Sequence, residues 1–199
     1  MARIGIMGGT FNPIHCAHLL IAEIAYENLG LDKVVFITGG NPPHKEGKAI
    51  VDAKIREEMV LAAISKNPNF EISSYETDKK EYSYTVDTLE YLKEKNPDDD
   101  FYFIIGADSL SYFEKWYKPQ RIAELATIAV YGRDGLDMNA LKDRILKIID
   151  ADIKIIDAPG FDISSSLIRE RVNNGKSIRY MVPEAVIKII EDKGLYIND

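Results

Sequence analysis

The chain has 199 residues, enough for one domain with a full hydrophobic core, and its composition (46% hydrophobic, 29% charged) is that of an ordinary globular protein. The formal net charge of −7 argues against a duplex nucleic-acid binder, which needs a basic face, but leaves a mononucleotide substrate open. The lone cysteine excludes an intrachain disulfide, and no apolar run approaches the length of a membrane span. Without a signal-peptide pattern, we expect a cytoplasmic protein that binds no membrane.

Strand-like apolar segments alternate with segments of helical period along the whole chain. We expect strands at Arg3–Met7, Val34–Thr38, Phe70–Ser73, Phe101–Ile105, Ile128–Tyr131 and Ile153–Ile156, and helices at Ala17–Asn28, Ala53–Asn67, Thr85–Glu94, Gln120–Glu124 and Met138–Ile149. This rhythm predicts an α/β fold with a parallel sheet and helices on both faces. Residues 1–199 form a single domain in this interpretation, and residues 164–199 are a short C-terminal helical tail packed on it.

The segment between the first strand and the first helix is the clearest functional signal. Two glycines, Gly8 and Gly9, expose backbone N–H groups at a turn, and a helix N-terminus follows with its partial positive charge. His15 and His18 stand three apart, so both imidazoles can face one anion. A simple turn is the first alternative. A metal site that includes Cys16 is the second, and it is weak because the chain has only three histidines and one cysteine.

Polar motifs also follow other predicted strands, and in parallel sheets such ends line the ligand site. His44 and Lys45 follow two stiffening prolines after the second strand, although an exposed surface loop would look the same. Gly106 and Asp108 follow the fourth strand, where Asp108 could accept bonds from ribose hydroxyls or merely cap a helix. Arg133 follows the fifth strand.

Two further motifs also follow predicted strands and are expected to converge on the same edge of the sheet. Ser164, Ser165 and Ser166 open a predicted helix with hydroxyl and N–H donors, and Arg169 adds a guanidinium fork suited to phosphate. An ordinary N-cap with a solvated arginine is the alternative. Trp116 is the only tryptophan, and its indole offers a flat face for the ring of a ligand unless it merely packs.

These motifs together resemble the nucleotidylyltransferase superfamily. The first signature runs from Gly8-Gly9-Thr10-Phe11 to His15-Cys16-Ala17-His18, with Ala17 where glycine is usual and Asn12 where many relatives have aspartate. The second is Ile163-Ser164-Ser165-Ser166-Leu167-Ile168-Arg169, with Ser166 in place of threonine. The Pro42-Pro43-His44-Lys45 loop and the regions of Thr85 and Trp116 resemble the nicotinate-nucleotide adenylyltransferases in particular. The resemblance extends from Arg3 to about Tyr196.

The resemblance implies a Rossmann-like, doubly wound sheet and adenylyl transfer from ATP to nicotinate mononucleotide. The products would be nicotinate adenine dinucleotide and pyrophosphate, formed by direct in-line attack during NAD biosynthesis. It implies a catalytic group of His15, His18, Lys45 and Arg169. The implied ATP contacts are Gly8, Gly9, Thr10, Phe11, His15, His18, Gly106, Asp108, Arg133, Ser165, Ser166 and Arg169, and those to nicotinate mononucleotide are His44, Lys45, Thr85, Trp116 and Tyr117.

Mg²⁺ is expected to accompany ATP through its phosphates, with no metal ligand from side chains. Two rival functions stay open: a superfamily transferase with phosphopantetheine or FMN as acceptor, and a nucleotide-binding regulator without catalysis. The sequence does not decide whether the chain assembles with copies of itself.

Overall fold

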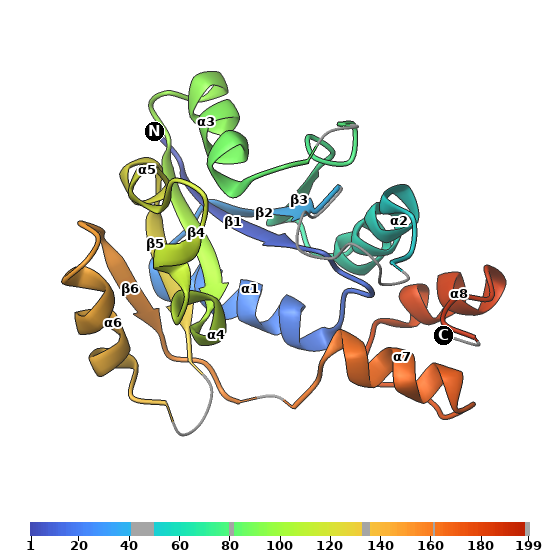
Figure 1. The fold of residues 1–199 in the computed structure, drawn as a ribbon. Helices are drawn as coiled ribbons and strands as arrows, with labels where there is room; N and C mark the ends of the chain where they lie inside the picture. Colours follow the sequence, from blue (N-terminus) through green and yellow to red (C-terminus); the bar gives the residue numbers. More distant parts are fainter. Residues whose placement is uncertain (41–49, 80–81, 133–135, 161, 198–199) are drawn as a thin grey trace. The chain divides into compact units, whose positions relative to one another are not determined.

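A computed structural model describes residues 1–40, 50–79, 82–132, 136–160 and 162–197 (Figure 1). Its strands are β1 (Arg3–Gly9), β2 (Lys33–Thr38), β3 (Phe70–Ser73), β4 (Asp100–Gly106), β5 (Thr127–Tyr131) and β6 (Ile153–Ile156). Its helices are α1 (Cys16–Leu29), α2 (Ala53–Ile64), α3 (Thr85–Lys95), α4 (Ala107–Leu110), the 3₁₀ helix η1 (Phe113–Lys115), α5 (Pro119–Leu125), α6 (Met138–Leu146), α7 (Ser165–Asn173) and α8 (Glu184–Asp192). All six predicted strands are confirmed.

The strands form one sheet in the order β3-β2-β1-β4-β5-β6, which is the order of a doubly wound α/β fold. Strand β1 pairs in parallel with β4, β4 with β5, and β5 with β6. The direction in which successive strands are added reverses between β1 and β4: β2 and β3 follow on one side of β1, and β5 and β6 follow on the far side of β4. The predicted Rossmann-like class is therefore confirmed, and the ends of β1 and β4 lie at its switch point.

The chain divides into two compact units, and each is described by itself. The first comprises Met1–Gly8, Ile21–Val35 and Tyr84–Phe161, and the second comprises Gly9–Leu20, Phe36–Ser83 and Asp162–Asp199. Strand β2 begins in the first unit and ends in the second. In the second unit, α8 packs against α2 (Figure 1). The single domain inferred for residues 1–199 stays a prediction.

Some helix ends differ from the sequence prediction. Helix α2 ends at Ile64 instead of Asn67, because Pro68 disfavours helical geometry at the residue before it. Helix α6 also ends early, at Leu146 instead of Ile149. The short helices α4 and η1 were not predicted, since three or four residues show no helical period.

The central strands of the first unit are buried on both faces, as their apolar sequences predict. Residues 4–7 of β1 are all buried, and so are Phe101 and residues 103–105 of β4. No helix within the described ranges is long and apolar enough to cross a membrane.

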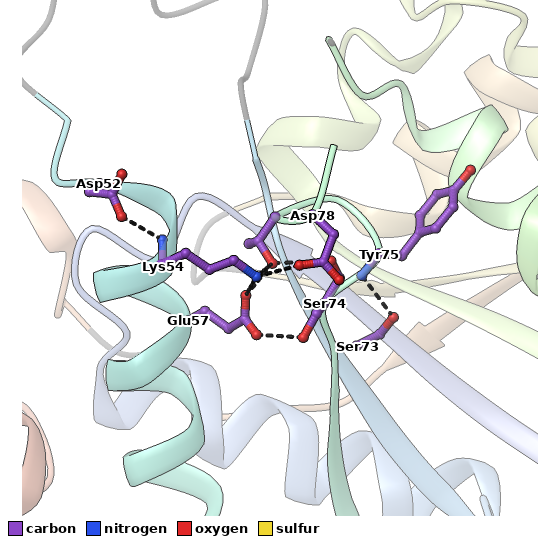
Figure 2. Close-up of polar contacts among 8 residues, drawn as sticks. Asp52, Lys54, Glu57, Ser73, Ser74, Tyr75 and Asp78 are labelled. Atoms are coloured by element: carbon purple, nitrogen blue, oxygen red, sulfur yellow. Dashed lines mark hydrogen bonds and ion pairs between the residues drawn. The ribbon is translucent and has the colours of Figure 1, made fainter. Parts of the chain in front are cut away.

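In the second unit, Glu57 of α2 anchors the loop that follows β3 (Figure 2). Its carboxylate accepts hydrogen bonds from the Ser74 hydroxyl at 2.5 Å, from the Thr77 hydroxyl, and from the Lys54 ammonium at 3.3 Å. Lys54 also pairs with Asp78 at 2.5 Å. Partial burial raises the pKa of Glu57, but these donors outweigh it and hold the pKa below its usual value of 4.5.

This network predicts acid sensitivity. A carboxyl whose pKa is lowered by folding contributes stability above pH 4.5 and loses it as the pH falls through the folded-state value. We expect the free energy of unfolding of Glu57→Gln to fall less steeply than that of the wild type below about pH 4.5. Urea unfolding across this range measures it. Glu58→Gln, which removes an exposed pair with Lys193, is the control; parallel curves for Glu57→Gln and the wild type would contradict the assignment.

Candidate active site

The turn between β1 and α1 has little conformational freedom. A side chain on Gly9 would place its Cβ 2.9 Å from the Phe11 ring, so that ring would have to shift to accept any other residue there. Phe11 adopts a left-handed backbone with φ of 47°, which is uncommon for a non-glycine residue. The first helical N–H group, that of Cys16, donates to the Met181 carbonyl at 2.8 Å. This donor is already used, so side chains must supply more of the predicted anion binding than the sequence suggested.

The two histidines of the turn lie face to face. Their ring centroids are 3.6 Å apart, and the Phe11 ring packs edge-on against His18 at 5.1 Å. His15 is buried and His18 is half-buried. The His15 backbone N–H donates to His18 Nδ1 at 3.3 Å. Desolvation by the surrounding protein, together with the charge on His15, holds the pKa of His18 well below 6.5, so His18 is a neutral imidazole at neutral pH.

The serine helix joins this turn within the second unit. Ser164 caps α7 by accepting from the Leu167 N–H at 3.2 Å, as predicted. The Ser165 hydroxyl donates to the Pro13 carbonyl at 2.8 Å. Arg169 donates to the Asn12 carbonyl at 2.8 Å and to the Ser166 hydroxyl at 3.3 Å. Arg169 lies one turn beyond the start of α7.

The structure therefore brings one part of the predicted site together. The residues that it gathers around the turn are Gly9, Thr10, Phe11, His15, His18, Ser165, Ser166 and Arg169, all of the second unit. Imidazole, hydroxyl and guanidinium groups are hydrogen-bond donors that suit phosphate oxygens.

The predicted pyridine-binding residues gather within the first unit. Trp116 is half-buried, with its ring 5.5 Å from Phe113 and 6.0 Å from Phe103. Its indole therefore packs against neighbouring rings, as in the interpretation of Trp116 as a packing residue, but it is not enclosed. Tyr117 is 50% exposed, and its ring lies 4.7 Å from that of Tyr84.

Thr85 is the first residue of α3 and directly follows Tyr84, the residue whose ring lies next to that of Tyr117. The cap residue Tyr84 makes no side-chain hydrogen bond to the helix. Backbone N–H groups in the first turn of a helix have no partner within the helix, so they can serve an anion such as a carboxylate.

Gly106 and Asp108 lie at the end of β4, also in the first unit. Gly106 caps α4, and a side chain there would come within 3.1 Å of the Tyr131 hydroxyl. Asp108 is an exposed residue in the first turn of α4 and is not its cap. The capping alternative for Asp108 is therefore wrong. Gly8 is the next-to-last residue of β1, on the other side of the same switch point, and is exposed.

Three predicted residues lie outside the described part of the chain: His44, Lys45 and Arg133. Within the described ranges, no group of three or more histidine, cysteine or acidic side chains could hold a metal ion. Burial raises the pKa of the Cys16 thiol, which disfavours its thiolate form.

Sequence reasoning gave no role to three residues of the second unit that support the turn. Asn12 is buried, and its side-chain oxygen accepts from the Tyr196 hydroxyl at 3.0 Å. The fully buried Arg56 donates to the Thr10 carbonyl at 2.5 Å. Its position among Met59, Val60 and Ile64 on the buried side of α2 is a signal that could have been found, because arginine is rare at such positions.

Comparison with known proteins shows the family of this chain. The family model described as cytidylyltransferase-like matches residues 6–171. A protein of Lachnoclostridium phytofermentans described as a "Probable nicotinate-nucleotide adenylyltransferase" is 42% identical over 99% of this chain and all of its own. One of Clostridium botulinum with the same description is 45% identical over 98% of both chains.

A solved structure shares the fold. The nicotinic acid mononucleotide adenylyltransferase of Plasmodium falciparum, complexed with NaAD, superposes with a TM-score of 0.79 at 21% identity over 98% of both chains. The full-length identity to the two bacterial relatives goes further than the fold, and with the match to the family model it assigns the chain. This chain belongs to the nicotinate-nucleotide adenylyltransferase family.

Proposed function

We propose that this protein catalyses adenylyl transfer from ATP to nicotinate mononucleotide, releasing pyrophosphate and forming nicotinate adenine dinucleotide for NAD biosynthesis. The observation that carries the proposal is the gathering of His15, His18, Ser166 and Arg169 around one glycine turn in a chain of this family. The bacterial relatives bear the name of this activity.

The chemistry needs positioning more than acid–base catalysis. The 5′-phosphate of nicotinate mononucleotide is already an anion, so it can attack the α-phosphorus of ATP without a general base or an enzyme nucleophile. The obstacle is to bring two polyanions together in line. Positioning of reactants can supply about 7–11 kcal/mol of the barrier reduction, and preorganised donors stabilise the charge that develops on the phosphate.

The contacts of His18 favour a specific role for its imidazole. Because Nδ1 accepts the hydrogen bond of the His15 N–H, the proton of the neutral ring is placed on Nε2. Nε2 is then a donor, and we assign it to the α-phosphate and its transition state. His15 assists at the phosphates, and Arg169 holds the leaving pyrophosphate with the hydroxyls of Ser165 and Ser166.

The remaining roles follow the sequence resemblance. Lys45, with His44, meets the attacking phosphate, and Asp108 accepts from the adenosine ribose while Arg133 stacks on adenine. Trp116 stacks on the pyridine, and the backbone N–H groups of Thr85 and Tyr117 bind its carboxylate. An amide in place of that carboxylate would point donors at donors, which gives a physical basis for preferring the acid.

Nucleotidyltransferases use a divalent metal with their nucleotide, and we propose Mg²⁺, which binds phosphate oxygens and keeps several waters. In this proposal Mg²⁺ enters as part of the ATP substrate, bound through its phosphate oxygens. The cytoplasmic location and any assembly with copies of itself stay predictions.

Pyrophosphate release tests the proposal directly. The purified protein is incubated with MgATP and nicotinate mononucleotide, and the dinucleotide is identified by mass spectrometry. Nicotinamide mononucleotide, FMN and phosphopantetheine replace the acceptor in parallel reactions. Turnover only with one of the last two would favour the rival transferases, and none with any acceptor would favour the regulator.

Loss of the indole should weaken the binding of the pyridine nucleotide. We expect Trp116→Ala to raise the KM for nicotinate mononucleotide about tenfold with little change in KM for ATP, since stacking on an aromatic side chain contributes about 1–3 kcal/mol. Tyr112→Ala is the control, because Tyr112 lies 6.3 Å from the Trp116 ring in the same aromatic group. An unchanged KM in Trp116→Ala would remove this residue from the site.

A further inference from the structure

Arg56 is a charged residue in the core of the second unit. Only 1% of its surface is exposed, and it shares the buried side of α2 with Met59, Val60 and Ile64. Burial lowers the pKa of its guanidinium, while Tyr196 and Asp52 oppose that change. Charged side chains are seldom buried unless their donors are satisfied, so the arrangement needs an explanation.

The guanidinium spans three chain segments with its planar fork. Nε donates to the Val51 carbonyl at 2.7 Å, Nη1 to the Thr10 carbonyl at 2.5 Å, and Nη2 to the Gly40 carbonyl at 3.0 Å. Thr10 follows β1 and Gly40 follows β2, so one side chain connects the ends of two neighbouring strands. Charge-assisted bonds of this kind are short and strong, and lysine cannot reproduce their geometry.

Backbone contacts lock the same strand ends together. The Gly39 N–H donates to the Gly9 carbonyl at 2.8 Å. A Cβ on Gly40 would overlap the carbonyl oxygen of Glu76, so Gly40, just after β2, lies directly against the loop after β3. The latter is anchored by Glu57, the neighbour of Arg56 on α2 (Figure 2). Consecutive residues of α2 therefore hold the loops that follow β1, β2 and β3.

The bond to Thr10 acts on the segment that carries the proposed chemistry. Phe11, the next residue, has the unusual positive φ and packs edge-on against His18. Asn12 then accepts the hydrogen bond from Arg169. A shift of the Thr10 carbonyl would be transmitted through Phe11 to the imidazole and through Asn12 to the guanidinium of Arg169.

We propose that Arg56 is a positioning residue for adenylyl transfer: it holds the turn at Thr10 against the end of β2, and thereby keeps Phe11, His18 and Arg169 in the arrangement that binds the triphosphate. The inference rests on the proposed function for its kinetic consequence, but the geometry it asserts can be observed in the free protein.

The test compares Arg56→Met and Arg56→Lys with Ile64→Ala. Ile64 is a buried residue of the same helix, so its truncation destabilises the core without removing a bond to the turn. We expect Arg56→Met to lower kcat at least about 30-fold per folded molecule, Arg56→Lys to recover part of it, and Ile64→Ala to keep kcat within threefold of the wild type. Circular dichroism measures the folded fraction at the assay temperature.

The NMR resonances of the imidazoles provide a second measurement, which would not change if the role of Arg56 were merely structural. The chain has only three histidines, so NMR can follow the titration of each. We expect the pKa of His18, which faces His15 and Phe11, to rise toward its ordinary range in Arg56→Met and to stay low in Ile64→Ala. If Arg56→Met fails to fold, Arg56→Lys takes its place in the test. It must then show a smaller fall in kcat and a smaller rise in the pKa of His18.

Wild-type kcat and an unchanged His18 titration in the folded Arg56 variants would overturn the inference. A wild-type protein that makes no dinucleotide would instead refute the proposed function, and the NMR comparison would then decide the positioning role separately.

Discussion

Replacement of His18 by alanine is expected to lower kcat at least about 100-fold, which corresponds to about 2.7 kcal/mol of transition-state stabilisation. The reason is the loss of one preorganised donor. His18 Nδ1 accepts the His15 N–H, and the Phe11 ring packs against the imidazole. The imidazole is therefore already oriented in the free protein, and its Nε2–H can meet the phosphate without reorganisation. Steady-state rates of pyrophosphate release at saturating substrates measure the effect.

The control for this change is His18→Gln, because the glutamine amide offers an N–H donor at a comparable distance from the backbone. We expect Gln to retain part of the rate that alanine loses. Since His18 is neutral at neutral pH, a positive charge is not required of it, and a neutral donor is a fair substitute. A His18→Ala enzyme that turns over within threefold of the wild type would refute the assignment.

Arg169→Met is the second change with a large expected effect. We expect kcat/KM for ATP to fall on the order of 100-fold, and the inhibition constant for pyrophosphate to rise, because a guanidinium fork to phosphate is lost. Part of the loss will come from the turn, since Arg169 also donates to the Asn12 carbonyl. Initial rates at varied ATP and added pyrophosphate separate binding from turnover.

Arg171→Met is the matched control, two residues further along α7. Arg171 donates to the Ser177 carbonyl and not to the turn, so its loss should leave kcat/KM within threefold of the wild type. Arg169→Lys should restore charge but not the planar fork, and therefore only part of the activity. Equal effects of the two methionine variants would show that Arg169 has no specific role.

The features that could be predicted from the sequence are those that depend on residues close together in the chain. Short apolar segments located every strand, the period of 3.6 located the long helices, and the serine run located the cap of α7 at Ser164. The short helices α4 and η1 were not predicted, because three or four residues are too few to show a helical period.

The candidate site was foreseen where its residues are close in sequence, as with His15 and His18. Family resemblance extended it to Ser165 and Arg169, more than a hundred residues away. It could not show that the Cys16 N–H is already used by the Met181 carbonyl, because a backbone bond between distant segments leaves no trace in residue types.

The order of elements, the glycine turn and the family were thus contained in the residue string, since each depends on short-range sterics, capping and periodicity. Packing alone brought Tyr196 to Asn12 across 184 positions and set the donors of Arg56 on carbonyls just beyond the ends of two separate strands. A carbonyl oxygen is present at every residue, so its partner is chosen by where the folded backbone passes and not by the side chain it belongs to.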